Sequence, residues 1–134
     1  MNTTYFLNLV ADNVFRKDTS PAIPTTYYVG LSTTTPAEDG TGVTEPTKAA
    51  GYKRVAASNL SPAVDGLVTN SSAISFDEPT ANWGTITHFV IFDAPSGGKL
   101  LMFGELSPHR TIEDSTTMTI KKGAIELSVC NLVT

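Results

Sequence analysis

The sequence predicts a mainly β protein, an antiparallel β-sandwich of about seven strands that follows one N-terminal α-helix. Short runs in which apolar and polar residues alternate recur between turn-forming segments, which is typical of half-buried strands. Helical spacing of apolar residues is confined to residues 1–17. We therefore expect a single domain over residues 1–134, with the sandwich at residues 26–134; a partly closed barrel is the alternative architecture.

The composition favours a protein whose surface lies against other proteins. Hydrophobic residues make up 40% of the 134 residues and charged residues only 16%, whereas about a quarter of the residues of a typical soluble protein are charged. Ser and Thr are abundant instead. A β-rich fold with neutral outer faces fits this mixture, and we expect part of that neutral surface to contact neighbouring subunits.

Charge and hydropathy argue against two kinds of partner. The formal net charge is −4 and the cations are scattered along the chain, whereas nucleic acid binding needs several cations on one surface. No apolar run approaches the ~18 residues of a membrane span, and the N-terminus lacks the pattern of a signal peptide. We expect no nucleic acid partner and no insertion into a membrane.

Residues 3–17 form the one stretch with clear helical periodicity. Thr3 or Thr4 can cap the start of this helix, and Arg16 and Lys17 lie where the helix dipole favours cations. Its apolar stripe must be buried, either across the protein's own sheet or on a neighbouring copy, in which case the helix is an intersubunit arm. The stripe comprises Phe6, Leu7, Val10, Val14 and, on the flank of the helix, Phe15.

The centre of the predicted sheet is the stretch 83–106, WGTITHFVIFDAPSGGKLLMFGEL, which has the pattern of two strands joined by a polar turn. Its first strand is apolar on both faces, as in a strand covered on both sides; one face carries Ile86, Val90 and Phe92, and the other carries Phe89 and Ile91. The second strand begins at residue 100, and Gly104 is expected to end its apolar run. The core residues of the hairpin are Trp83, Phe89, Ile91, Phe92, Leu100, Leu101 and Phe103.

The remaining strands are short. Residues 26–32 place Tyr27, Val29 and Leu31 on one buried face. A turn is expected over residues 107–115. Further strands are expected at 51–56 (anchored by Tyr52 and Val55), 67–68, 73–76 (with Ile74 and Phe76 inward), 116–120 and 124–130, the last with Ile125, Leu127 and Val129 on one face and a small buried Cys130.

Residues 33–50 form a long loop rich in Thr, Pro, Gly and acids. Loops of this length inside a compact domain are usually functional or lie at an interface. The run Asp39-Gly40-Thr41-Gly42 lacks the ligand spacing of a calcium loop. We expect the surface used for assembly on the helix, the first strand and this loop, at Phe6, Val10, Val14, Phe15, Tyr28, Glu38, Asp39 and Val43.

The sequence contains none of the residue combinations that catalysis requires, so we expect no enzyme, no metal and no cofactor. His88 alternates with core residues and is expected to be a buried or half-buried, hydrogen-bonded ring, whereas His109 is expected to be exposed. Asp93 is placed to accept hydrogen bonds from the turn backbone. Glu105 is expected to pair with a cation, namely Lys99, Lys53 or Arg110.

Four motifs together resemble a known family. They are YYVGLSTTTP at 27–36, GYKRV at 51–55, the stretch 83–106 quoted above, and GAIELSV at 123–129. Their order is similar to that in small virion proteins of tailed bacteriophages, often labelled tail fibre or virion structural proteins. The second half of the chain also resembles, more loosely, the attachment domains of phage tail fibres.

This resemblance implies a virion protein, assembled in the host cytoplasm and held by other phage structural proteins at the tail tip, baseplate or fibre attachment region. Copies of one subunit on a symmetric particle imply a homo-oligomer, a trimer or a ring. Two alternatives stay open: a decoration protein on the capsid, and a β-sandwich module that binds a carbohydrate or a host surface receptor.

Overall fold

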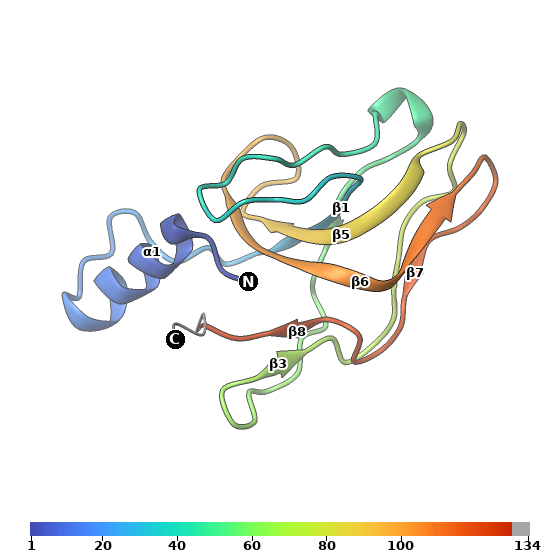
Figure 1. The fold of residues 1–134 in the computed structure, drawn as a ribbon. Coiled ribbons are helices and arrows are strands. Elements are labelled where there is room, and N and C mark those ends of the chain that lie inside the picture. Colours follow the sequence, from blue (N-terminus) through green and yellow to red (C-terminus); the bar gives the residue numbers. More distant parts are fainter. Residues whose placement is uncertain (130–134) are drawn as a thin grey trace.

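The structure, a computed structural model, describes residues 1–129 and is mainly β with one α-helix, as predicted. Figure 1 shows the elements in chain order. They are α1 (Thr4–Phe15), β1 (Tyr28–Ser32), the 3₁₀ helix η1 (Lys48–Ala50), β2 (Val55–Ala56), β3 (Val68–Thr69), β4 (Ile74–Ser75), β5 (Gly84–Phe92), β6 (Leu100–Ile112), β7 (Thr119–Ile120) and β8 (Glu126–Leu127).

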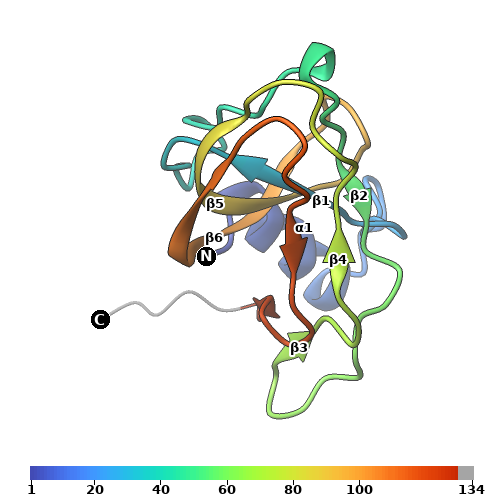
Figure 2. The same cartoon turned by 90° about the vertical axis from the view of Figure 1, so that its right-hand side faces the viewer.

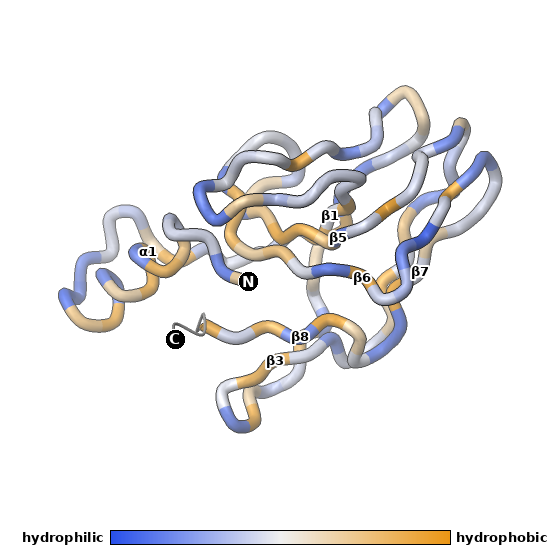
Figure 3. The backbone as a smooth tube through the Cα atoms, in the orientation of Figure 1, coloured by the Kyte–Doolittle hydropathy of each residue, from blue (hydrophilic) through white to orange (hydrophobic). Residues whose placement is uncertain are grey.

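The strands form two layers with antiparallel pairing throughout. One layer is a four-stranded sheet in the order β2-β1-β5-β6, and two small ribbons, β3-β8 and β4-β7, lie across one of its faces. The main core fills the space between them, with Leu31 and Ile91 from the sheet against Ile120 and Leu127 from the ribbons. Figure 3 shows the hydrophobic segments of β5 and β6 running through the centre of the molecule.

β5 is covered on both faces, as predicted for the centre of the sheet. Phe89 and Ile91 belong to the main core. Val90 and Phe92 belong to a second cluster on the opposite face, in which Leu100 is also buried and Val43 and Phe103 are partly buried. The loop 33–50 therefore supplies part of the cover on the outer face of the sheet.

The side expected for Ile86 was wrong. Ile86 is fully buried in the main core beside Phe89 and Ile91 and not with Val90. Between the pairs Ile86↔Arg110 and His88↔Glu105, β5 advances by two residues while β6 advances by five. Such a bulge breaks the two-residue alternation of side chains, so residues before and after it exchange faces.

The second strand of the hairpin is longer than the sequence indicates. β6 continues through Gly104 to Ile112, so the turn expected over 107–115 was wrong for residues 107–112, which include part of the bulge. Gly104 pairs with Phe89, and a Cβ atom at Gly104 would lie 2.5 Å from Cε1 of the Phe89 ring. Glycine is required here because it makes room for an aromatic ring, and it does not end the strand.

The N-terminal half of α1 packs on the protein's own sheet, the first of the two placements considered above. Thr3 caps the helix, accepting from the Phe6 N–H at 3.3 Å, and its hydroxyl donates to Leu100 O at 2.8 Å. The Thr3 N–H donates to Leu101 O at 2.9 Å, which extends the sheet beside β6. Phe6 and Leu9 are buried in the main core. The rest of the helix extends beyond the β layers (Figure 1).

The short strands lie within or close to the expected ranges but are mostly two residues long. Val29 and Leu31 are buried as predicted, yet Ser32 on the opposite face is also fully buried, and its hydroxyl accepts from the Thr44 N–H of the loop at 3.1 Å. Val129 is half exposed and does not share the buried face of Ile125 and Leu127. Cys130 lies outside the described residues.

Trp83 gives a direct test of the core. Its ring is buried edge-on against Tyr52, with centroids 5.4 Å apart, and its Nε1–H donates to Ala50 O at 2.9 Å. Trp83→Ala removes a large buried ring, so we expect a loss of about 3–5 kcal/mol in the free energy of unfolding by urea titration. Trp83→Phe retains an aromatic ring and should cost clearly less. A near-neutral Trp83→Ala would contradict this account of the core.

Candidate functional site

Arg54 joins three separate segments at one end of the sheet. Its guanidinium donates to both carboxylate oxygens of Glu45, from Nε at 3.0 Å and from Nη2 at 2.6 Å. Nη1 donates to Ala94 O at 2.7 Å and to Gly97 O at 2.8 Å. The side chains of Arg54 and Glu45 are only 6% and 20% exposed. We call these contacts the Arg54 clamp; they hold the loop 33–50 and the turn after β5 against the segment that leads into β2.

The clamp is extended by Tyr52 and by the ring of Phe92. The Arg54 guanidinium carbon lies 3.6 Å from the centroid of Phe92, a cation–π contact. The Tyr52 hydroxyl donates to Glu45 Oε2 at 2.5 Å and accepts from the Leu31 N–H at 3.0 Å. Burial, and then the hydrogen bond to the Glu45 carboxylate, raise the pKa of Tyr52 far above its usual range, which keeps the phenol a donor.

The turn between β5 and β6 is held by Asp93, as predicted. Asp93 Oδ1 accepts from the Lys99 N–H at 2.8 Å. Gly98 has a φ of +75°, and a Cβ atom there would lie 2.4 Å from Asp93 Oδ1, so glycine is needed for this closure. The carbonyls of Ala94 and Gly97 are thereby presented to Arg54.

The loop 33–50 is tied to itself by backbone and side-chain hydrogen bonds. The Thr33 N–H donates to Thr44 O at 2.9 Å, and Asp39 Oδ1 accepts from the N–H and the hydroxyl of Thr41, at 3.0 and 2.6 Å. These bonds to Thr41 lower the pKa of Asp39. Of the predicted loop residues, Glu38 and Asp39 are exposed, whereas Val43 is partly buried against the second cluster. The clamp therefore presents an ordered acidic tip, residues 38–42.

The predicted interface residues of the helix fall into two groups. Phe6 is buried in the protein's own core and Val10 is partly buried against it, whereas Val14 is 49% and Phe15 84% exposed. Nine positions separate Phe6 from Phe15, which at ~100° per residue places the two rings on opposite faces of α1. Tyr28 is half-buried and lines a shallow polar hollow with Thr26 and Asp93. The exposed apolar side chains, Val14 and Phe15, therefore lie at the projecting end of the helix.

The bulge in β6 brings together two ionisable side chains. Glu105 Oε2 lies 2.9 Å from His109 Nε2, and this exposed pair replaces the cation partner that the sequence suggested for Glu105. The hydrogen bond from His109 lowers the pKa of Glu105. His88 is buried, with Nδ1 2.8 Å from Thr87 Oγ1, as predicted, and burial lowers its pKa. Within residues 1–129 no group of His, Cys, Asp or Glu is arranged to hold a metal ion.

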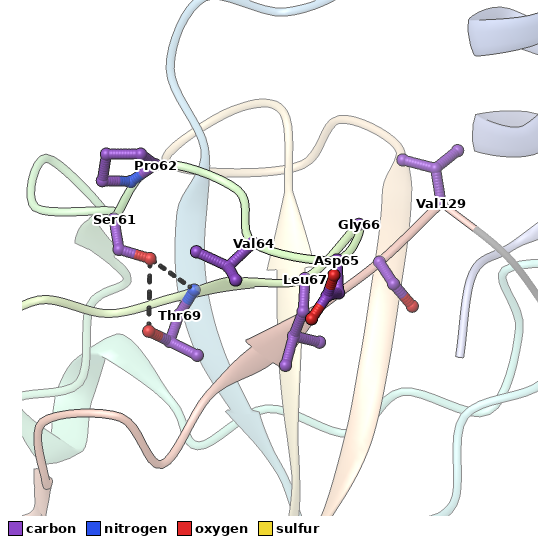
Figure 4. A pocket seen from close by; sticks show the side chains of 9 residues that line it. Ser61, Pro62, Val64, Asp65, Gly66, Leu67, Thr69 and Val129 are labelled. Carbon is purple, nitrogen blue, oxygen red and sulfur yellow. Dashed lines mark hydrogen bonds between the residues drawn. The ribbon is translucent and has the colours of Figure 1, made fainter.

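One surface feature was missed in the sequence. The Val64 N–H donates to Leu67 O at 2.9 Å and the Leu67 N–H donates back to Val64 O at 3.0 Å, around Asp65-Gly66. Both central residues have positive φ, the signature of a tight hairpin turn, and Asp-Gly is its typical sequence. An open hollow of about 890 Å³ lies over this hairpin (Figure 4). Val64 and Leu67 expose apolar surface there.

Comparison with protein families identifies one for this chain. A family model described as "Podophage GP4 fiber I protein gp80" matches residues 1–128, nearly the whole chain. No curated protein matches. Among the helices of residues 1–129, none has the length and apolar character needed to cross a membrane.

The Arg54 clamp predicts a large cost for removing one partner. Arg54→Ala leaves the Glu45 carboxylate without its bidentate partner, so we expect a loss of about 3–5 kcal/mol in the free energy of unfolding. Lys53→Ala is a matched control, because the neighbouring Lys53–Asp77 pair is exposed at both side chains and should change stability by less than about 1 kcal/mol. Equal losses in the two variants, measured by urea unfolding, would contradict the clamp.

The buried His88 predicts loss of stability in mild acid. Because folding lowers its pKa, the folded protein binds this proton less readily than the unfolded chain. The contribution of the neutral ring is complete above the unfolded pKa, about 6.5, and is lost as the pH falls from there through the lower folded pKa.

Urea titrations across this range should show the decline in the native protein and a flatter curve in His88→Asn. His109→Asn, which keeps the buried ring, should retain the decline. The same slope in His88→Asn as in the native protein would rule out this assignment.

Proposed function

We propose a function from the premise that this chain belongs to the family of the podophage GP4 fiber I protein gp80. The family is one of phage structural proteins, and the chain is a bacteriophage structural protein of the tail-fibre type. Its proposed place is the tail tip, baseplate or fibre attachment region, where other structural proteins hold it. It is assembled into the virion in the host cytoplasm and acts through protein–protein contacts, not catalysis.

The observation that carries this proposal is that one buried ion pair orders two loops whose tips are exposed. The buried ion pair of Arg54 and Glu45 fixes two loops and leaves their tips in the solvent. A loop that is ordered before it binds loses little conformational entropy on binding, so its contacts are stronger. The acidic tip with Glu38 and Asp39, together with the end of α1, is the proposed assembly surface.

Several identical copies are proposed to act together. Subunits on a symmetric particle form closed rings or trimers through repeated contacts, and the low charge of the chain suits a surface that is largely covered.

Deleting residues 1–17 is a poor test of a role of the helix in assembly, since the deletion removes Phe6 and Leu9 from the core as well as any contact between copies.

The acidic tip predicts a selective defect in assembly. Glu38→Arg reverses an exposed charge at a proposed interface. We therefore expect incorporation into purified virions, measured by quantitative mass spectrometry, to fall about tenfold. Glu113→Arg is the matched control at another exposed site and should incorporate normally. Urea unfolding should show both variants folded. Equal incorporation of the two would remove the tip from the interface.

The place on the particle is tested by gold-labelled antibody on intact virions. Label at the tail supports the proposal, and label over the head would instead support a capsid decoration protein. A chain absent from virions that binds glycans on an array would support a receptor-binding module and overturn the assembly role.

A further inference from the structure

We propose that Phe15 of one copy inserts into an apolar pocket of a second copy, formed between α1, the 60–68 hairpin and β8. The inference rests on the proposed function, because it supplies the contact that joins copies in the fibre component. It identifies both surfaces of that contact on this chain.

The pocket has a volume of about 280 Å³ and lies between α1 and the β3-β8 ribbon. Its wall is the apolar surface of the main core, since Phe6, Met102 and Leu127 are buried members of that core and Tyr27 packs against it. Phe6 and Tyr27 meet edge-to-face, with ring centroids 6.5 Å apart. Gly66 and Val129 also line the hollow of Figure 4, so the two cavities lie next to each other.

Phe15 is the most exposed large apolar side chain among residues 1–129, at 84%. It is the last residue of α1, on the projecting end of the helix. It lies ~13 Å along the axis from Phe6 and on the opposite face. The ring therefore cannot reach the pocket of its own chain while the helix is intact, and a contact between the two must join different copies.

The ring and the pocket match in size and in charge. A cavity of about 150 Å³ is enough to bind benzene, so this pocket accommodates a phenylalanine ring. Asp65 is the one charged side chain among the described residues that line the two hollows. Arg16 and Lys17 follow Phe15 directly, so insertion of the ring brings these cations toward Asp65, which lines the adjoining hollow. Arg16 also forms an exposed pair with Asp12 of its own helix, 3.6 Å away.

The contact joins two different patches, so it is heterologous. Contacts of this kind produce a ring when the rotation between copies closes, and a filament when it does not. Either product is an assembly of identical subunits, as the proposed function requires.

The experiment uses two full-length chains in a Cys130→Ser background, mixed and then oxidised. One carries Arg16→Cys and the other Asp65→Cys, so that Phe15 is retained. We expect a disulfide between the two chains, and none above background when Asp114→Cys, an exposed site elsewhere, replaces Asp65→Cys. Adding Phe15→Ala to the first chain should lower the yield about tenfold or more. Val14→Ala, the control at the neighbouring exposed residue, should change it little.

Three results would overturn the inference: a yield equal to that of the Asp114→Cys control, a yield unaffected by Phe15→Ala, or a native chain that sediments only as a monomer. If residues 130–134 of the same chain or another protein's side chain fill the pocket instead, Phe15→Ala will leave the yield unchanged. If the native chain is present in virion tails but the cysteine variants form no Phe15-dependent disulfide, this inference alone is overturned. If the variants form the disulfide but the native chain is absent from virions, the proposed function alone is overturned.

Discussion

The charge of Arg54 cannot be taken out of water without full compensation, and this constraint organises one end of the molecule. The guanidinium makes two bonds to Glu45 and one each to the carbonyls of Ala94 and Gly97. A buried ion pair is stable only when such additional hydrogen bonds are made. The loop, the segment before β2 and the hairpin turn must therefore take up their positions together. Arg54 of the GYKRV motif thereby contacts two carbonyls of the DAPSGGK turn.

The clamp also explains how the central strand is covered on both faces in so small a chain. Within residues 1–129, the two ribbons cover one face of β5 and no further sheet covers the other. Because Glu45 is fixed by Arg54, the loop 33–50 lies over that second face and Val43 packs on the cluster of Val90 and Phe92. The buried ion pair of Arg54 and Glu45 thus permits burial of Val90 and Phe92 on the outer face of the sheet.

The parts of the fold that depend on local pattern were predictable, and the parts set by a distant partner were not. Alternation correctly placed Val29, Leu31, Ile74 and Phe76 inward, because each short strand is regular. It misplaced Ile86, since the bulge that changes its face arises from pairing with residues 105–110. The partners of Arg54 lie up to 43 positions away, beyond any spacing rule. The Asp65-Gly66 turn did carry a local signal, which was overlooked because the flanking strands are so short.

The two halves of the helix differ in burial, and this difference bears on the proposed contact between copies. Its first half is fixed to the body by Phe6, Leu9 and the Thr3 cap, so the second half projects as a rigid extension and not as a tether. A flexible arm would lose conformational freedom on binding, whereas a helix already anchored in the core loses little. Anchoring of the first half of the helix therefore lowers the entropic cost of the proposed contact between Phe15 and a second copy.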